Sequence, residues 1–210
     1  MRPLTVVICV DHAFVSGGQS KVAIESALGL AAAGARVIFF SACGPADARL
    51  AAAGVEIICL DQQDILGNPS RLDAARQGIW NFKASKALAE TLSALSRERA
   101  IVHVHGWAKA LSPSIAKPIQ ASGLPAVYTM HEFFLNCPNG GFYNFQKNEV
   151  CPLKPMSFAC LRTNCDSRNY PFKLWRSARQ FVAEHVAHLA QSFSDIVLLS
   201  DLQEKVLASC

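Results

Sequence analysis

The sequence predicts an α/β domain with a doubly wound, mostly parallel, Rossmann-like sheet that spans residues 1–210 and carries one long cysteine-containing insertion. Three observations predict this fold class. Continuous apolar runs such as LTVVICV recur along the chain, as expected for strands buried on both faces of a parallel sheet. Each of the early runs is followed by a segment rich in helix-forming residues. Strand and helix alternate regularly over the first 130 residues, which favours parallel strands joined by right-handed crossovers.

Local signals place the individual elements. Gly34 and Gly54 follow helix-forming segments and are expected to end them. Ser112 and Pro113 are a preferred N-cap and a preferred first helical residue. In chain order we expect strand 4–10, helix 21–33, strand 36–42, helix 45–53, strand 55–60, helix 74–99, strand 100–106, helix 112–122, strand 125–130, helix 172–192, strand 195–200 and a last helix from 201.

The regular alternation stops between residues 132 and 171. This segment of about 40 residues has no sustained helical or strand period, and loops of that length are uncommon in compact domains unless they are functional. Helix 172–192 follows it. Its periodicity predicts a buried face formed by Trp175, Ala178, Val182, Val186 and Leu189, with the basic residues elsewhere.

Ligands of doubly wound sheets bind beyond the carboxyl ends of the strands, so the residues at these ends are the candidate site. Three strand ends carry histidine, and they are expected to converge on one edge of the sheet. The candidate residues are Asp11, His12, Ser16, Gly17 and Gly18 after the first strand, His103 and His105 in and after the fourth, and His131 and Glu132 after the fifth.

The chemistry of these residues leaves alternatives open. The Ser16-Gly17-Gly18 turn opens a helix and could hold an anion, but it is equally read as a plain glycine turn, because no G-x-G-x-x-G or P-loop pattern is present. His103 and His105 share a strand face and could both point at a ligand or a metal. His103, within the apolar run, is read as a core histidine or as one that supports a binding residue, and a metal site is disfavoured because no third ligand is near. His131 is either a rim hydrogen-bond donor or a capping residue.

Four stretches together resemble the N-terminal, acceptor-binding lobe of GT-B fold glycosyltransferases of the retaining family four. They are VVICVDHAFVSGGQSKVAIESALGLAAAGARVIFF, IVHVHGW, PAVYTMHEFFLNCPNGG and SDIVLLSDLQEKV, and their order covers almost the whole chain. The Cys-Pro-x-Gly stretch resembles a subset of the family with a cysteine-containing insertion.

This resemblance implies an enzyme that transfers a sugar from a nucleotide-diphosphate sugar to a polysaccharide or glycolipid acceptor, without a catalytic metal. It implies that His131 contacts the donor sugar as the catalytic residue. The substrate-binding residues by resemblance and position are Asp11, His12, Ser16, Gly17, Gly18, His105 and Glu132. The donor-binding C-terminal lobe, with its two glutamates eight positions apart, does not precede Cys210, so we expect this lobe alone to be inactive.

The insertion carries four cysteines, Cys137, Cys151, Cys160 and Cys165, with 13, 8 and 4 residues between them. Structural zinc, disulfides and free thiols are the alternatives. Ordering so long a loop costs about 1–2 kcal/mol per residue in backbone entropy, and a reducing cytosol favours zinc over disulfides as the stabilising element.

Residues 146–180 combine basic and aromatic side chains. The basic ones are Lys147, Lys154, Arg162, Arg168, Lys173, Arg176 and Arg179. They predict peripheral contact with an anionic membrane, a grip on a phosphate-bearing acceptor, or a solvated face. The overall net charge of +4 is ordinary and gives no indication of nucleic acid as a partner.

The first residues fit a buried strand better than a signal peptide, and no apolar run has the roughly 18 residues that span a bilayer. A cytoplasmic protein, peripheral at the inner face of the membrane, is expected. Two other functions stay open: a non-catalytic nucleotide- or metal-binding Rossmann-like module, and another GT-B enzyme such as a nucleotide-sugar epimerase.

Overall fold

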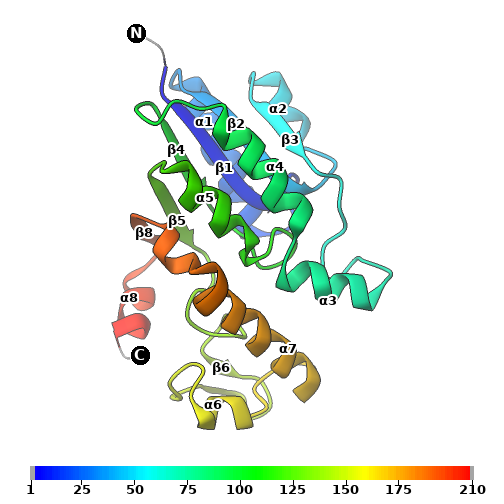
Figure 1. The fold of residues 1–210 in the computed structure, drawn as a ribbon. Coiled ribbons are helices and arrows are strands. Elements are labelled where there is room, and N and C mark those ends of the chain that lie inside the picture. The colour runs from blue at the N-terminus through cyan, green and yellow to red at the C-terminus, as the bar shows by residue number, and fades with distance from the viewer. Residues whose placement is uncertain (1–2, 209–210) are drawn as a thin grey trace.

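The chain forms one six-stranded parallel sheet with helices packed on both faces (Figure 1). The structure is a computed structural model and describes residues 3–208; Cys210 lies outside the described residues. The strand order is β3-β2-β1-β4-β5-β8 and every neighbouring pair is parallel. The predicted fold class and all six predicted strands are therefore confirmed. The sheet elements are β1 Thr5–His12, β2 Arg36–Cys43, β3 Glu56–Cys59, β4 Ala100–Val104, β5 Ala126–Met130 and β8 Asp195–Leu198.

The helices and the short elements complete the fold. The helices are α1 Gly18–Ala32, α2 Ala48–Ala52, α3 Arg71–Ile79, α4 Phe82–Ser93, α5 Ala116–Ser122, α6 Phe158–Arg162, α7 Tyr170–Phe181 and α8 Asp201–Ala208. The 3₁₀ turns are η1 Pro113–Ile115 and η3 Leu189–Ser192, the π-helical turn is η2 Val182–Ala187, and a two-stranded hairpin pairs β6 Tyr143–Asn144 with β7 Glu149–Val150. Positive φ angles at Gly34 and Gly54 confirm these residues as the predicted helix stops.

Alternate residues of the central strand β1 are buried in two separate hydrophobic cores, one on each face of the sheet. Val7 and Cys9 of β1 face the cluster completed by α4, α5 and η2. Val6, Ile8 and Val10 face the cluster completed by α1 and α2. The period of two along an uninterrupted apolar strand thus produces the two helical layers of a doubly wound sheet.

The predicted helix 74–99 is wrong, because the chain forms two helices, α3 and α4, with a break at Trp80–Asn81. Asn81 caps α4 by accepting a hydrogen bond from Ala84 N at 3.0 Å. Its backbone N–H donates to Ser112 Oγ at 2.8 Å and its Nδ2 donates to Ala110 O at 2.8 Å. Asn81 therefore caps α4 and also satisfies backbone and side-chain groups of a distant loop. These hydrogen bonds stabilise a helix boundary at a position where local periodicity alone predicts that the helix continues.

The predicted buried face of helix 172–192 is only partly correct: Leu189 is buried and Trp175 and Val182 are half-buried, but the other two members are exposed. The α-helix ends at Phe181 and continues as the π-helical turn η2, which shifts the phase of the later residues. Ala178 is exposed and Val186 is 47% exposed. The buried residues of α7 are instead polar: Lys173, Ser177, Arg179 and Gln180.

Burial of Lys173 and Arg179 also changes the interpretation of the basic segment. Lys173 is 0% exposed and Arg179 is 2% exposed, so neither belongs to a surface that meets a membrane. Arg176 pairs with the buried Asp166 at 3.0 Å. The seven predicted basic residues therefore do not form one continuous exposed stripe.

Helix α7 docks on α3 through a glycine. The ring of Trp175 lies against Gly78, where an added Cβ would approach it to 2.6 Å, and Trp175 Nε1 donates to Ala75 O at 3.2 Å. The two helices lie side by side in Figure 1.

Alanine substitution at two helical glycines should therefore have opposite effects. Gly78→Ala is expected to lower the free energy of unfolding by about 1–3 kcal/mol, because Trp175 must move away from α3. Gly29→Ala in α1 is the matched control, since its Cβ would meet nothing within 4 Å, and it should add about 0.5–1 kcal/mol through helix propensity. Urea unfolding of both variants measures the difference; equal shifts would contradict this packing.

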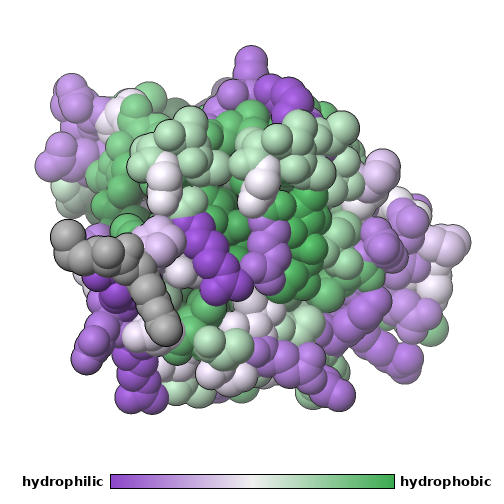
Figure 2. Space-filling model, turned by 90° about the horizontal axis from the view of Figure 1, so that it is seen from above, coloured by the Kyte–Doolittle hydropathy of each residue, from purple (hydrophilic) through white to green (hydrophobic). Residues whose placement is uncertain are grey.

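The end of the molecule at which the strands begin lies opposite the predicted rim. Figure 2 views this end, where apolar residues gather across the middle and hydrophilic ones lie around them. The carboxyl ends of α1 and α2 carry exposed alanines. Within residues 3–208, no helix is long and apolar enough to cross a bilayer.

Candidate functional site

The predicted site residues gather at the carboxyl edge of the sheet. The strand order reverses between β1 and β4, and this switch point is where open α/β sheets bind ligands. His12 ends β1, His105 follows β4 and His131 follows β5. The turn at Gly106 packs against the start of α1, because Gln19 Nε2 donates to His105 O at 2.6 Å. The predicted convergence of three strand ends is thereby observed.

Three histidines form a chain across two strands. The rings of His103 and His105 are 4.1 Å apart between centroids. His105 Nδ1 lies 3.2 Å from His131 Nε2. His103 Nε2 lies 2.8 Å from Thr129 Oγ1. His103 therefore has a hydrogen-bonded core position, as the sequence predicted, while His131 is half-buried at the rim.

The buried end of this chain indicates which nitrogens carry protons. His105 Nε2 is buried and has no hydrogen-bond partner among the described residues. An unpaired buried N–H is rarer than an unpaired acceptor, so we infer that the His105 proton lies on Nδ1. That proton is donated to His131 Nε2, which leaves the proton of neutral His131 on Nδ1. His131 thus has an N–H group that no protein atom uses.

Burial keeps this chain neutral. Burial, with smaller contributions from the neighbouring His103 and His131, lowers the pKa of His105 to about 3. The pKa of His131 is also lowered, first by burial and then by His103. Burial raises the pKa of the Glu132 carboxyl, against an opposing effect of Lys109. The rim therefore presents a neutral imidazole, followed in the chain by a carboxyl group whose burial disfavours its charged form.

The lowered pKa of His105 should make folding sensitive to acid. Because the folded-state pKa is below the value of 6.5 in an unfolded chain, its contribution to stability is complete above pH 6.5 and declines as pH falls toward about 3. The expected slope is about 1.4 kcal/mol per pH unit. Urea unfolding measures the free energy of unfolding at neutral pH and at about pH 4.5. The decrease between these two pH values should be smaller by about 2–3 kcal/mol in His105→Gln than in the unsubstituted protein. Identical pH profiles would contradict a neutral, buried His105.

Asp11 and His12 are held by protein partners. The Asp11 carboxylate accepts hydrogen bonds from the backbone N–H groups of Lys109, Ala110 and Leu111 at 3.1, 2.8 and 2.9 Å. His12 Nε2 lies 3.1 Å from Asp64 Oδ2. Both residues are buried. They therefore position the rim loops, and the direct substrate contact expected of them stays a prediction.

The glycine turn remains open to a ligand. Gly17 precedes α1 without a side-chain cap, and a Cβ at Gly17 or Gly18 would meet nothing within 4 Å. Ser16 is engaged with Ser20, whose Oγ accepts from Ser16 N at 2.9 Å. The free N–H groups at the start of this 15-residue helix lie beside the rim and favour an anion there.

Sequence reasoning missed the charged residues that surround Glu132. The positive charges of Lys109, Arg179 and Arg176 each act to lower the pKa of Glu132. The Arg179 guanidinium lies 4.8–5.5 Å from the ring centroids of Trp107, Phe134 and Trp175. Burial lowers the pKa of Arg179 to about 10. No local signal distinguishes this arginine from the other basic residues of the segment, because Trp107 and Phe134 lie 72 and 45 positions away in the chain.

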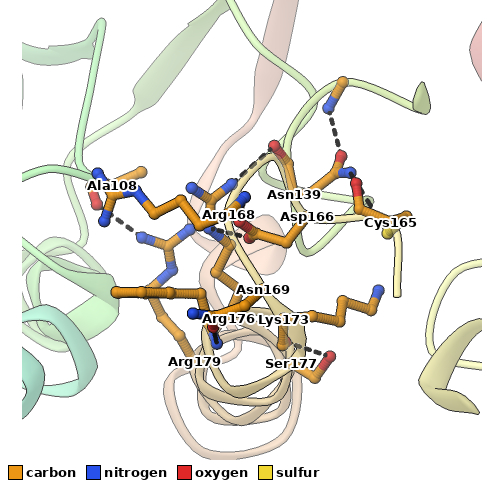
Figure 3. A network of polar contacts seen from close by, with 12 residues as sticks. Ala108, Asn139, Cys165, Asp166, Arg168, Asn169, Lys173, Arg176, Ser177 and Arg179 are labelled. Atoms are coloured by element: carbon orange, nitrogen blue, oxygen red, sulfur yellow. Dashed lines mark hydrogen bonds and ion pairs between the residues drawn. The ribbon is translucent and has the colours of Figure 1, made fainter. Parts of the chain in front are cut away.

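The cysteine segment is organised by side-chain hydrogen bonds (Figure 3). Asn139 Nδ2 donates to Tyr143 O at 2.8 Å and to Cys165 O at 3.2 Å. Arg176 joins the network through Asp166 at 3.0 Å. Between β5 and α7 the only regular elements are the β6–β7 hairpin and α6. The predicted irregular segment is thus folded and tied to α7.

The zinc site expected at the four cysteines stays a prediction, because the described residues show no ligand arrangement that supports it. The four thiols are free, and the described range 3–208 has no group of three or more His, Cys, Asp or Glu side chains arranged to hold a metal. Lys173 Nζ lies 3.3 Å from Cys160 Sγ. Burial acts to lower the pKa of Lys173, but the Cys160 and Cys165 sulfurs outweigh burial and raise it. An ammonium group thus takes the position beside these sulfurs that a metal would need.

Comparison with known proteins agrees with this arrangement. Residues 17–190 match the model of the family described as glycosyl transferase 4-like domain. The crystal structure of LpCGTa in complex with UDP aligns with 100% of this chain and 49% of its own, with a TM-score of 0.50 and 15% sequence identity. The chain therefore spans about half the length of that structure. No curated protein matches the sequence significantly.

An open parallel sheet with a polar rim at its switch point defines a Rossmann-like ligand-binding domain. The family match covers most of the chain and makes the assignment specific. The chain belongs to the glycosyl transferase 4-like domain family.

Proposed function

We propose that this chain is the acceptor-side lobe of a retaining GT-B glycosyltransferase, which moves a sugar from a nucleotide-diphosphate donor to a polysaccharide or lipid-linked acceptor. The observation that carries the proposal is the rim histidine: His131 Nε2 lies 3.2 Å from Nδ1 of His105, which follows β4 at the switch point, and the tautomer inferred above leaves His131 an uncommitted N–H. A neutral imidazole N–H can donate to a sugar hydroxyl or to charge that develops during transfer.

Two further features support this function. The uncapped start of α1 at Gly17 and Gly18 is open to the phosphate groups of a nucleotide sugar. The related structure of LpCGTa contains UDP. A second, donor-binding lobe would complete the cleft, and the reaction would need no catalytic metal if the helix end and rim donors balance the phosphate charge.

We place the enzyme in the cytoplasm, where nucleotide sugars would reach it. The seven described cysteines are free, which is in keeping with a reducing compartment. Contact with an anionic membrane would have to use the exposed basic residues, such as Arg162 and Arg168, because Lys173 and Arg179 are buried.

The test is transfer from a panel of UDP-, GDP- and dTDP-linked sugars by the full-length enzyme, with product stereochemistry read by NMR. The expected result is transfer from one donor with the anomeric configuration retained. Inversion would overturn the retaining mechanism, and epimerisation of the nucleotide sugar without transfer would favour the epimerase alternative.

A further inference from the structure

A groove separates α3 from α7 next to the rim. It encloses about 290 Å³ and its apolar wall is formed by Ile65, Leu66, Ala74, Ala75, Phe172 and Trp175. Leu66 is 50% exposed and Phe172 is 39% exposed, so large apolar side chains face solvent on both sides. Grooves of this size and lining bind small molecules that carry an apolar part.

The groove is connected to the candidate site through one loop. Ile65 directly follows Asp64, the partner of His12 at 3.1 Å. The backbone N–H of Ile65 donates to Lys109 O at 2.9 Å, in the turn that Asp11 holds. The groove is therefore joined to the rim turn through the backbone of Ile65.

The apolar surface continues beyond the groove. A more open hollow shares Ala75 and Trp175 with it and extends over Ile79, Trp80 and Phe82. Phe82 is 77% exposed. Together the two hollows form an elongated apolar path, which suits an extended chain better than a compact ring.

Positive charge lines the groove end of this path. Arg71, Arg168 and Arg176 all line the groove. Arg176 is paired with Asp166. Arg71 and Arg168 are exposed and form no ion pair with a carboxylate among residues 3–208. Arg71 donates one side-chain hydrogen bond, to Leu66 O at 3.2 Å, and the Arg168 guanidinium lies 4.7 Å from the Phe172 ring centroid. Most of their N–H donors are therefore available to an anion.

We propose that this groove binds the phosphate end of a single-chain lipid phosphate, with the alkyl or isoprenoid chain along α3 and α7 and the phosphate between Arg71 and Arg168. The proposal rests on the proposed function, because it makes this ligand the lipid part of the acceptor. Neither half of the surface is explained alone: an apolar ligand leaves the arginines without an anion, and a free anion leaves the apolar path uncovered.

The test is binding of dodecyl phosphate to the full chain by calorimetry, below its micelle concentration, beside dodecyl maltoside and inorganic phosphate. Dodecyl phosphate is expected to bind saturably and about tenfold or more tightly than either comparison ligand. Arg71→Ala/Arg168→Ala should weaken it about tenfold or more. Leu66→Ser should weaken it severalfold through the chain. Arg97→Ala/Arg99→Ala removes the same charge from exposed positions away from the groove and should change binding less than about twofold.

Four outcomes would overturn the proposal: no saturable binding, equal affinity for the maltoside, equal affinity for inorganic phosphate, or no effect of the Arg71/Arg168 change. Binding only to vesicles that contain phosphatidylglycerol would assign the surface to a membrane instead. If dodecyl phosphate binds but the full-length enzyme transfers no sugar, the proposed glycosyltransferase function is wrong and the lipid-phosphate site in the groove is supported. If Arg71→Ala/Arg168→Ala transfers sugar to lipid-linked acceptors with an unchanged KM for the acceptor, the groove is not the lipid-phosphate site and the glycosyltransferase function is supported.

Discussion

Replacement of His131 by alanine in the full-length enzyme is expected to lower kcat for sugar transfer by about 10²- to 10⁴-fold. The reason is the loss of the rim N–H that the inferred tautomers leave on His131 without a protein acceptor. The fold should persist, since His131 is half-buried and its hydrogen bond to His105 contributes about 1 kcal/mol. Steady-state kinetics and urea unfolding separate the two effects.

His131→Asn sharpens the same test. The asparagine Nδ2 takes a position close to imidazole Nδ1 and keeps an N–H donor but cannot transfer a proton near neutral pH. If His131 acts by donating a hydrogen bond, His131→Asn should recover part of the lost rate. His185→Ala, at an exposed position on η2, is the control and should leave kcat unchanged. Full activity of His131→Ala would refute its assigned role.

Asp11→Ala is expected to have the largest effect on stability, about 3–5 kcal/mol of the free energy of unfolding. Its carboxylate accepts hydrogen bonds from three backbone N–H groups in the turn after Trp107, and each donor left unsatisfied costs about 1–3 kcal/mol. Since small domains have only about 5–15 kcal/mol in total, the variant should be close to unfolding. Its urea midpoint measures this directly.

Two companion variants distinguish this structural role from substrate binding. Asp11→Asn keeps one oxygen for Ala110 and Leu111 but places an amide opposite Lys109 N, so about half the loss is expected. Asp73→Ala removes an exposed carboxylate whose ion pair with Arg76 is 3.7 Å long, and should cost less than about 1 kcal/mol. A stable Asp11→Ala protein with a raised KM would instead restore the substrate-binding interpretation.

The strands and the rim could be predicted because their signals are local. A run such as LTVVICV is apolar at every position, so it can only be stable where both faces are buried. In a parallel sheet all carboxyl ends meet at one edge, and the convergence of His105 and His131 follows from that geometry. Family-level motifs in the same stretches predicted the glycosyltransferase-like domain that the comparison then showed.

The rest depended on contacts between distant residues. The break between α3 and α4 depends on hydrogen bonds of Asn81 to residues 29 and 31 positions away. Helical periodicity placed Ala178 and Val186 inside, but the structure buries Lys173 against Cys160 and Arg179 among aromatic rings. A sequence pattern records the average polarity of a residue, whereas burial of a charge is decided by whether folding brings a partner to it.

The amino-acid pattern was enough to predict the parallel sheet, the order of its elements and the edge at which the candidate site residues gather. The three-dimensional contacts were needed to show that Asp11 holds a loop, that the four cysteines form no metal-binding group among the described residues, and that Arg71 and Arg168 line an apolar groove without an ion pair. The difference follows from the range of the forces involved. Backbone pairing and apolar periodicity act between near neighbours, while hydrogen-bond and charge satisfaction depend on which distant residues the finished fold brings together.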